Sequence, residues 1–324
     1  MNQTDNNIES HENLVKEVVF GHFGKYPEAI ERMKVGMDNE VYSVDLGDQK
    51  YIVRLNQRES LKGSSKNIPL FQSKGIKVPE IIAEDYSKST SPYNWQILAR
   101  LEGTDIDKVI LTLSEEQLDA IAKEIAGIEK KLVTLPTNGM YGWVGLNDKK
   151  LKSTLTEEVE EMLATIKSRN KKTGAVKEEY IELFAKVLEK YKNYFNSAPS
   201  QFYFDDMSSK NVMIHEGKFS GLVDLDGVAY GDPLEGIGRI KASWYGTTYG
   251  DYYANAVMDA LELSDKQREA VTMWALLNRI YWQAEIGVQF NQNSSLEVDP
   301  KRVESGNIVI EGLANELGVS RQHD

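Results

Sequence analysis

The chain has 324 residues, of which 41% are hydrophobic and 27% charged, and its formal net charge at pH 7 is −12. This is an ordinary globular composition, and the chain is long enough for two lobes that each bury a core. The acidic balance argues against binding to nucleic acid, which requires cations that neutralise phosphates. Cysteine is absent and only four histidines occur, so disulfides, thiol nucleophiles and histidine-rich metal centres are not expected.

No apolar run approaches the ~20 residues that a membrane-spanning helix needs. The first residues, MNQTDNNIESHENL, have neither the basic start nor the apolar centre of a signal peptide. We therefore expect a cytoplasmic protein without a membrane partner. The sequence makes no prediction of the oligomeric state.

In chain order, the first hundred residues have the pattern of an antiparallel, hairpin-rich lobe. Residues 1–9 are polar and are expected to be disordered, whereas residues 12–20 fit a short helix. The segment 59–74 is expected to contain another helix. Short apolar runs bounded by turn residues predict strands at 30–35, 41–46, 50–55, 78–82 and 95–99.

After Gly103 the spacing of apolar residues changes to that of helices. Ser114-Glu-Glu-Gln117 is a capping box, and apolar residues then recur at spacings of three and four as far as Leu132. Further helices are expected at 156–168, 175–195, 249–262 and 264–289. The layout is thus a β-rich lobe over 1–101, a connection near 98–105 and a helical lobe over 102–324. Clefts between lobes are where small ligands usually bind.

The segment 202–235, FYFDDMSSKNVMIHEGKFSGLVDLDGVAYGDPLE, interrupts the helices with one predicted hairpin. Its strands are expected at 211–215 and 219–224, joined by a two-residue loop in which Gly217 supplies the backbone freedom of a tight turn. In this register His215 faces Lys218.

The same register makes Asn211 face Leu222. Asp224 lies two residues beyond Leu222, so the strand period of two places it on the same sheet face as Asn211. Such diagonal neighbours lie roughly 7–8 Å apart, a gap that two oxygen-bearing side chains can close on one Mg²⁺. Asp206 lies in the loop just before the first strand. These three residues predict a magnesium ion and a hydroxyl nucleophile held beside a phosphate.

Over roughly residues 30–290 the chain resembles the aminoglycoside phosphotransferase family, small-molecule kinases that also include macrolide phosphotransferases and choline kinases. The family typically shows His-Gly-Asp, four residues, Asn, a hairpin, Ile-Asp-Trp or Ile-Asp-Phe, and then Gly-Asp-Pro. The resemblance implies an α+β, two-lobed protein-kinase-like fold with a small antiparallel N-terminal lobe and a larger, mainly helical C-terminal lobe. The corresponding residues here are Phe204-Asp205-Asp206, Asn211, Val223-Asp224-Leu225 and Gly231-Asp232-Pro233.

The resemblance also implies roles for individual residues of the second lobe. Asp206 would be the catalytic base that positions the substrate hydroxyl, and Asn211 and Asp224 would be the metal ligands. Asp226 would either help to bind a second metal ion or be solvated. Asp232 would be structural, tying a loop to a helix.

In the N-terminal lobe, Gly36-Met-Asp-Asn39-Glu-Val-Tyr42 resembles the turn with which the family covers the nucleotide's phosphates. Gly36 would let the backbone approach them. Arg54 stands where the strand lysine of kinases normally stands, and a cation there would neutralise phosphate charge. The backbones of Ala99 and Leu101, in the lobe connection, would contact the adenine or guanine.

The chain departs from the family pattern before Asp206, and the acidic residue that would pair with Arg54 is not assigned to one position. Phe204-Asp205 replaces the usual His-Gly, so the histidine that braces the loop is missing and a second carboxylate stands beside the first. The acidic helix partner of Arg54 is Glu59 or lies in the region Ser64–Lys66.

These features predict a phosphotransferase that uses Mg²⁺ and moves the γ-phosphoryl group of ATP or GTP to a hydroxyl of a small molecule. The acceptor would be aminoglycoside-, macrolide-, amino-alcohol- or sugar-like. The alternative is a catalytically impaired kinase-like binding module, favoured by Phe204-Asp205 and by the arginine at position 54. Acidic and aromatic residues of the helical lobe either bind the acceptor or form a packed, solvated helix pair. They are Trp244, Tyr245, Tyr249, Asp251 and Glu285.

Overall fold

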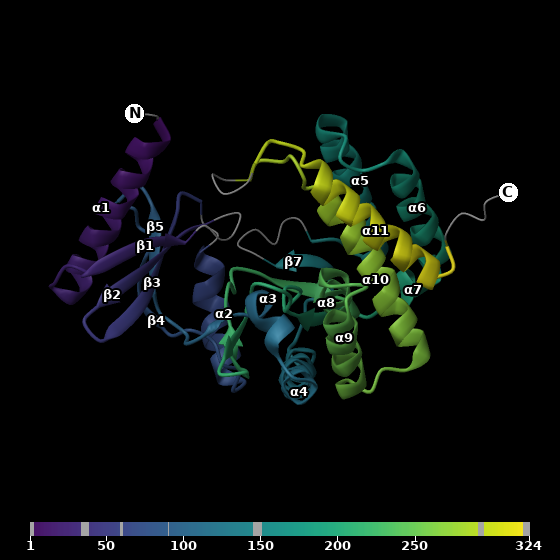
Figure 1. The fold of residues 1–324 in the computed structure, drawn as a ribbon, viewed down its shortest axis with the longest axis horizontal. Coiled ribbons are helices and arrows are strands. Elements are labelled where there is room, and N and C mark those ends of the chain that lie inside the picture. The colour runs from purple at the N-terminus through teal and green to yellow at the C-terminus, as the bar shows by residue number, and fades with distance from the viewer. Residues whose placement is uncertain are drawn as a thin grey trace. The chain divides into compact units, whose positions relative to one another are not determined.

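The computed structural model describes residues 3–33, 39–58, 61–89, 91–144, 151–290 and 295–319. The chain divides into two compact units. The first contains Met1–Leu101 and the short segment Asp224–Asp226, and the second contains Glu102–Val223, Gly227–Gln289 and the last helix. An antiparallel sheet dominates the first unit and helices dominate the second, which confirms the α+β class (Figure 1).

In the described part of the first unit, five strands form one antiparallel sheet in the order β1-β2-β3-β5-β4. β2 and β3 form a hairpin, and β5 pairs with the other side of β3, so that Arg54 on β3 lies between Val41 and Gln96. This central position makes Arg54 a buried residue of the sheet. The strands are β1 (Ala29–Met33), β2 (Glu40–Leu46), β3 (Gln49–Asn56), β4 (Ile81–Asp85) and β5 (Asn94–Ala99).

Helix α1 (Gln3–Phe23) lies along this sheet (Figure 1). Val15 and Val19 are fully buried in the same apolar cluster as Tyr42 and Val53 of the strands. Residues 3–9, which we expected to be disordered, continue this helix. Packing against the sheet fixes the later turns of α1, so the unfavourable nucleation step has already occurred. Each further residue that joins the helix then gains one hydrogen bond for the conformational entropy that it loses. Helix α2 (Leu61–Ser73) fills the expected helical segment.

The second unit contains two small antiparallel sheets among its described residues, ordered β10-β9-β6 and β7-β11-β8. β8 leads into the loop that carries Asp206, and β11 leads into the Gly231-Asp232-Pro233 turn before the next helix. The strands are β6 (Thr104–Asp105), β7 (Gly142–Val144), β8 (Gln201–Tyr203), β9 (Val212–His215), β10 (Lys218–Leu222) and β11 (Val228–Gly231).

Helices α4 and α10 begin at capping boxes on Ser114 and Ser264, as the sequence predicted. The single helix expected over 175–195 is two helices, which meet at Tyr191. The helical elements are α3 (Ile106–Val109), the 3-10 helix η1 (Ile110–Thr112), α4 (Glu115–Leu132), α5 (Leu155–Thr173), α6 (Glu178–Lys190), α7 (Lys192–Ser197), α8 (Leu234–Ser243), α9 (Thr248–Ala260), α10 (Asp265–Gln283) and α11 (Pro300–Glu316).

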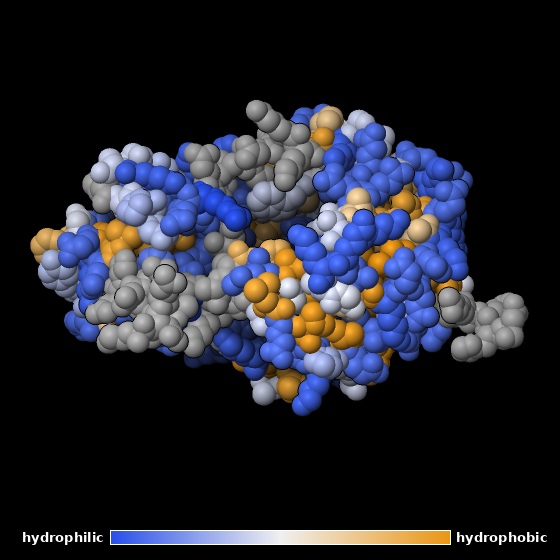
Figure 2. All heavy atoms as spheres, turned by 90° about the horizontal axis from the view of Figure 1, so that it is seen from above, coloured by the Kyte–Doolittle hydropathy of each residue, from blue (hydrophilic) through white to orange (hydrophobic). Residues whose placement is uncertain are grey.

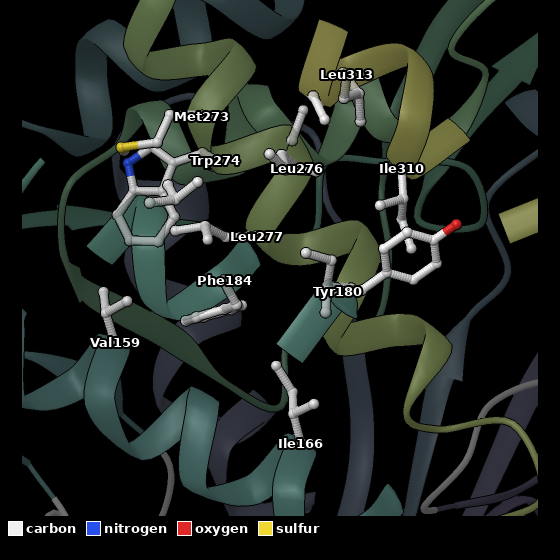
Figure 3. Packing of buried hydrophobic residues seen from close by; sticks show 14 of the residues in the cluster. Val159, Ile166, Tyr180, Phe184, Met273, Trp274, Leu276, Leu277, Ile310 and Leu313 are labelled. Atoms are coloured by element: carbon white, nitrogen blue, oxygen red, sulfur yellow. The ribbon is translucent and has the colours of Figure 1, made fainter. Parts of the chain in front are cut away.

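Helix α10 forms the centre of the core of the second unit (Figure 3). Its Trp274 and Leu277 are almost fully buried, together with Phe184 of α6 and Ile310 of α11. Figure 2 shows hydrophilic side chains over most of the visible surface, with apolar residues in scattered groups. None of the described helices combines the length and the apolar character that a membrane span requires.

The β9–β10 hairpin differs from the expected register. His215 faces Lys218 as predicted, but the pairing shifts between Phe219 and Gly221, so that Leu222 faces Val212 and not Asn211. One residue, Ser220, is thus inserted in β10, as in a β-bulge. The prediction that Asn211 faces Leu222 is therefore wrong by one residue.

The end of this hairpin follows from the inserted residue. The N–H of Val223 donates to the carbonyl oxygen of Asn211 at 3.0 Å. Asp224 has a φ of 62°, in the left-handed region, so it has already left the strand conformation. The period-of-two argument does not extend to Asp224, because that period holds only while the backbone stays extended.

Candidate active site

The loop between β8 and β9 holds Asp206 and Asn211 against each other. The amide nitrogen Nδ2 of Asn211 donates to Oδ2 of Asp206 at 2.6 Å, and the hydroxyl of Ser208 donates to Oδ1 at 2.9 Å. The side chain of Asp206 is nevertheless 44% exposed. The result is an orientated carboxylate that remains open to solvent, which is the condition of a group that acts on another molecule.

Arg239 of α8 lies behind this loop. Its Nη1 is 3.1 Å from Oδ2 of Asp205 and 3.9 Å from Oδ1 of Asp206, and its Nε is 3.8 Å from Oε1 of Glu235. The hydroxyl of Tyr203 donates to the other oxygen of Glu235. Sequence reasoning did not identify Arg239 or Glu235. Their spacing of four residues could have predicted the contact, because residues i and i+4 lie on the same face of a helix and can form an ion pair.

Burial and charge act in opposite directions in this cluster. Burial raises the pKa of Asp205, the charge of Arg239 opposes this, and the charge of Asp206 adds to the increase. Burial by itself disfavours the charge of Arg239, but Asp205, Glu235 and Asp206 outweigh it and raise the pKa of the guanidinium. Arg239 therefore stays charged beside the loop. Phe204, which replaces the family's histidine, is 1% exposed and packs in the core.

Asp232 has the structural role that we expected. Its Oδ2 accepts hydrogen bonds from the hydroxyl of Tyr194 and, at 2.6 Å, from the indole nitrogen of Trp274. Its Oδ1 accepts from the N–H of Leu234 at 3.1 Å, at the start of α8. The carboxylate thus ties the turn before α8 to α7 and α10, and all three donors are satisfied inside the protein.

In the first unit, Asp226 is the acidic partner of Arg54. Nη2 of Arg54 is 2.5 Å from Oδ2 of Asp226 and 2.8 Å from Oδ1 of Asp224. Its Nη1 donates to the hydroxyl of Ser64 at 3.0 Å, and that hydroxyl donates to Oδ1 of Asp226. Burial disfavours the charge of Arg54, but Asp226 and Asp224 outweigh it and raise its pKa.

The helix contact of Arg54 is therefore the neutral Ser64, within the expected region Ser64–Lys66, and the negative charge comes from the segment Asp224–Asp226. Glu59, the other expected partner, lies outside the described residues. Helix α2 approaches this segment closely: a Cβ at Gly63 would lie 1.7 Å from the carbonyl oxygen of Asp226. The amide nitrogen of Asn67 donates to the carbonyl oxygen of Leu225 at 2.9 Å.

The residues expected to bind the nucleotide are all assigned to the first unit. Gly36 lies outside the described residues. Asn39 is buried, donates through Nδ2 to Oδ2 of Asp226 at 2.6 Å and accepts from the amide of Asn56 at 2.7 Å. Ala99 ends β5, and its N–H donates to the carbonyl oxygen of Glu80 at 2.9 Å. Leu101 lies two residues beyond that strand, at the end of the first unit's main segment.

The expected metal ligands present hard oxygen atoms. Asn211 uses its amide nitrogen for the bond to Asp206, which leaves Oδ1 as the atom that could bind a cation. The side chain of Asp224 is 47% exposed, and its Oδ1 accepts a hydrogen bond from Arg54. In Asp226 both carboxylate oxygens already accept hydrogen bonds, from Ser64, Arg54 and Asn39. An amide and a carboxylate fit Mg²⁺, which prefers oxygen ligands.

The described residues contain no cluster of three or more His, Cys, Asp or Glu side chains that could hold a metal ion. A magnesium ion bound by the expected ligands would therefore need oxygen atoms from outside the protein in addition to the amide of Asn211 and the carboxylate of Asp224. Mg²⁺ commonly keeps such ligands, because it is bound through one or two carboxylates together with phosphates and water.

Most of the residues suggested for acceptor binding have partners within the helical unit. Trp244 is buried and its indole nitrogen donates to Asp107 at 2.9 Å, and Asp251 accepts from the N–H of Gly246 at 3.1 Å. Glu285 pairs with Nη1 of Arg169 at 3.2 Å. Burial raises the pKa of Glu285, while Arg169 and then Arg239 oppose the increase.

Comparison with known proteins gives one family. The model of the phosphotransferase enzyme family, APH, matches residues 29–271. No curated protein matches the sequence. Solved structures of aminoglycoside phosphotransferases share the fold at low sequence identity.

An apo structure of a thermostable mutant of aminoglycoside phosphotransferase APH(4)-Ia has 15% identity and a TM-score of 0.69, over 94% of this chain and 100% of that one. A ternary complex of such a mutant with AMP-PNP and hygromycin B has 14% identity and a TM-score of 0.68, over 95% and 99%. A GDP complex of an aminoglycoside 2'-phosphotransferase-IIIa mutant has 13% identity and a TM-score of 0.68, over 93% and 96%. These similarities show that the chain has the kinase-like fold of these enzymes.

Proposed function

The chain belongs to the phosphotransferase enzyme family, and from this premise we propose that it transfers the γ-phosphoryl group of ATP or GTP to a hydroxyl group of a small molecule. The observation that carries the proposal is the carboxylate of Asp206, which is orientated by Asn211 and Ser208 and is still 44% exposed. The acceptor belongs to the aminoglycoside-, macrolide-, amino-alcohol- or sugar-like classes.

Asp206 is the catalytic base in this proposal. The transition state of phosphoryl transfer is loose and rich in charge, so catalysis rests mainly on position and electrostatics. The two hydrogen bonds to Asp206 reduce the freedom of its carboxylate before the acceptor arrives. The carboxylate then accepts a hydrogen bond from the acceptor hydroxyl, aligns it with the phosphorus atom and takes its proton late in the transfer.

Residues 1–101 form the nucleotide-binding lobe and residues 102–324 the catalytic and substrate-binding lobe in the same proposal. Arg54 adds positive charge beside the phosphates, Gly36 belongs to the turn that covers them, and Ala99 and Leu101 contact the base. Asn39 supports Arg54 through Asp226, a role favoured by its 2.6 Å bond to that carboxylate.

Asn211 and Asp224 would hold Mg²⁺, which when bound neutralises phosphate charge and orders the triphosphate. Asp226 was expected either to bind a second metal ion or to be solvated. The three donors on its oxygens favour a different role, as the countercharge that keeps Arg54 in place.

Nucleotide binding tests the metal assignment. We expect ATP or GTP to raise the melting temperature of the wild-type protein in the presence of Mg²⁺, and Asp224→Ala to weaken this effect by at least about tenfold in nucleotide affinity. The matched control is Asp45→Ala, which removes a carboxylate paired with exposed Lys50 in the same unit. Unchanged magnesium-dependent binding in Asp224→Ala would show that Asp224 is not a ligand.

The acceptor class requires a screen of amino sugars, macrolides, choline-like amines and simple sugars, each with Mg²⁺ and with ATP or GTP. A small-molecule kinase produces the nucleoside diphosphate faster when the right acceptor is present. A catalytically impaired binding module is the alternative, and Phe204-Asp205 is the observation that favours it. Such a module would bind ligands but would not hydrolyse the triphosphate, even slowly, without an acceptor.

A further inference from the structure

Helix α8 supports the loop of Asp206 in two independent ways. Its first turn packs directly on the loop backbone: a Cβ at Gly236 would lie 3.3 Å from the carbonyl oxygen of Phe204 and 3.6 Å from Cα of Asp205. One turn further along, Arg239 forms the ion pair with Asp205 and lies 3.9 Å from Asp206. The helix therefore contacts the loop both at the backbone and at the two neighbouring carboxylates.

The side chain of Arg239 is itself held from several sides. Glu235 lies on the same helix face, and the guanidinium lies 5.9 Å from the ring centroid of Trp282. The side chain is only 19% exposed. A planar guanidinium held from several sides has little conformational freedom. It can therefore restrict the positions of the carboxylates of Asp205 and Asp206 that it contacts. The charged and titratable groups that surround it are Tyr203, Asp205, Asp206, Glu235, Tyr281 and Glu285.

We propose that Arg239 is a positioning residue for Asp206, and that the Asp205–Arg239 ion pair supports the catalytic loop where the family pattern has His-Gly. The inference rests on the proposed function, because it assigns Arg239 a task in the phosphoryl transfer that Asp206 performs. Phe204 anchors the loop in the core, and Asp205 turns to α8 where the family has a glycine. The charge of Asp205 is thereby tied to Arg239 and does not compete with Asp206 for the acceptor.

The alternative is that Arg239 only neutralises the charge of Asp205, whose side chain is 14% exposed. Removing the cation alone would then harm the protein because an unpaired buried charge remains. The two possibilities differ in a double variant. In Asp205→Asn with Arg239→Met, the unpaired charge of Asp205 is gone but the support of Asp206 is still missing.

The test measures magnesium-dependent hydrolysis of ATP and of GTP without an added acceptor, so no knowledge of the acceptor is needed. The variants are Arg239→Met, Arg239→Lys, and Asp205→Asn with Arg239→Met. Lys241→Met is the matched control, because Lys241 lies on the same helix, is 12% exposed and pairs with Glu316 at 2.7 Å. Circular dichroism and thermal melting show which variants are folded.

We expect Arg239→Met to lower kcat by about 10- to 100-fold and to change the nucleotide KM by less than about threefold. A misplaced Asp206 carboxylate slows the chemical step but leaves nucleotide binding almost unchanged. Arg239→Lys should recover part of kcat, and the double variant should stay as slow as Arg239→Met. If Arg239→Met alone does not fold, Arg239→Lys and the double variant decide the question.

Recovery of the double variant to within about twofold of the wild type would overturn the inference, and so would equal rates in Arg239→Met and Lys241→Met. The proposed function fails in a different way: the wild-type protein would then hydrolyse neither nucleotide. The two failures are thus distinguishable in one set of measurements.

Discussion

Two arginines with little exposed surface, one in each unit, hold carboxylates in different ways. In the first unit Arg54 pairs with Asp226, whose two oxygens accept hydrogen bonds from Ser64, Arg54 and Asn39 and whose side chain is 12% exposed. In the second, Arg239 faces Asp205, Asp206 and Glu235, and Asp206 stays 44% exposed.

The difference separates support from reactivity. A carboxylate whose two oxygens both accept hydrogen bonds inside the protein is suited to holding a neighbour, and Asp226 fits that role. A carboxylate that is orientated but open is suited to acting on a ligand, and Asp206 fits that one. In both clusters the carboxylates outnumber the single guanidinium. In the second cluster, burial raises the pKa of Asp205 and of Glu235, while the charge of Arg239 opposes the increase.

The largest effect on stability is expected from Arg54→Met. This change removes the cation from Asp226 and leaves a buried carboxylate without its charged partner, at a cost of about 3–5 kcal/mol in the free energy of unfolding. Urea denaturation followed by circular dichroism measures it. The control is Lys50→Met on the same strand, whose ion pair with Asp45 is exposed and should contribute little. Equal losses in the two variants would show that Asp226 does not depend on Arg54 as its charged partner.

A smaller effect is expected from Glu158→Gln, at the edge of the second cluster. Burial raises the pKa of Glu158 to about 7, with Glu235 and Glu161 adding to the increase and Lys152 opposing it. Because the pKa is higher in the folded state, the protonated form favours folding. The stability that this provides is fully present below the unfolded-state pKa and is lost as the pH rises through about 7.

Glu158→Gln keeps the size of the side chain and removes its ionisation. Relative to wild type, the variant should therefore gain on the order of 1–2 kcal/mol in the free energy of unfolding between about pH 5 and about pH 8. Urea denaturation at both pH values measures the difference. Glu160→Gln on the same helix, at an exposed position, serves as the control. A pH dependence identical to wild type would show that the excess of carboxylates has no energetic consequence at Glu158.

The local elements of the site could be predicted from the sequence. A short apolar run predicted the strand that carries Arg54. The short separation of Asp206 and Asn211 in the chain let the structure join them by a 2.6 Å hydrogen bond, a contact that the sequence reasoning did not foresee. Both are short-range patterns, in which a few neighbouring residues determine the backbone. The capping boxes of α4 and α10 belong to the same class.

The rest depended on contacts between distant segments. The pairing of Arg239 with Asp205 joins residues 34 positions apart, and that of Arg54 with Asp226 joins residues 172 positions apart. The inserted Ser220 shifted the register by one residue. Gly221, which follows it inside the strand, was the available signal, because an isolated glycine in a strand often marks a bulge, but the sequence reasoning did not use it. Such features are set by packing, which a pattern of residue types along the chain does not determine.

The most direct test of the central claim is the rate of magnesium-dependent ATP and GTP hydrolysis by the wild-type protein and by Asp206→Asn. We predict that the wild type hydrolyses at least one nucleotide slowly without an acceptor. In Asp206→Asn the rate should fall by about 10²- to 10⁴-fold while nucleotide affinity stays nearly constant, because the amide keeps the volume and loses the base. A rate in Asp206→Asn within about twofold of wild type would contradict the assignment of Asp206 as the catalytic group.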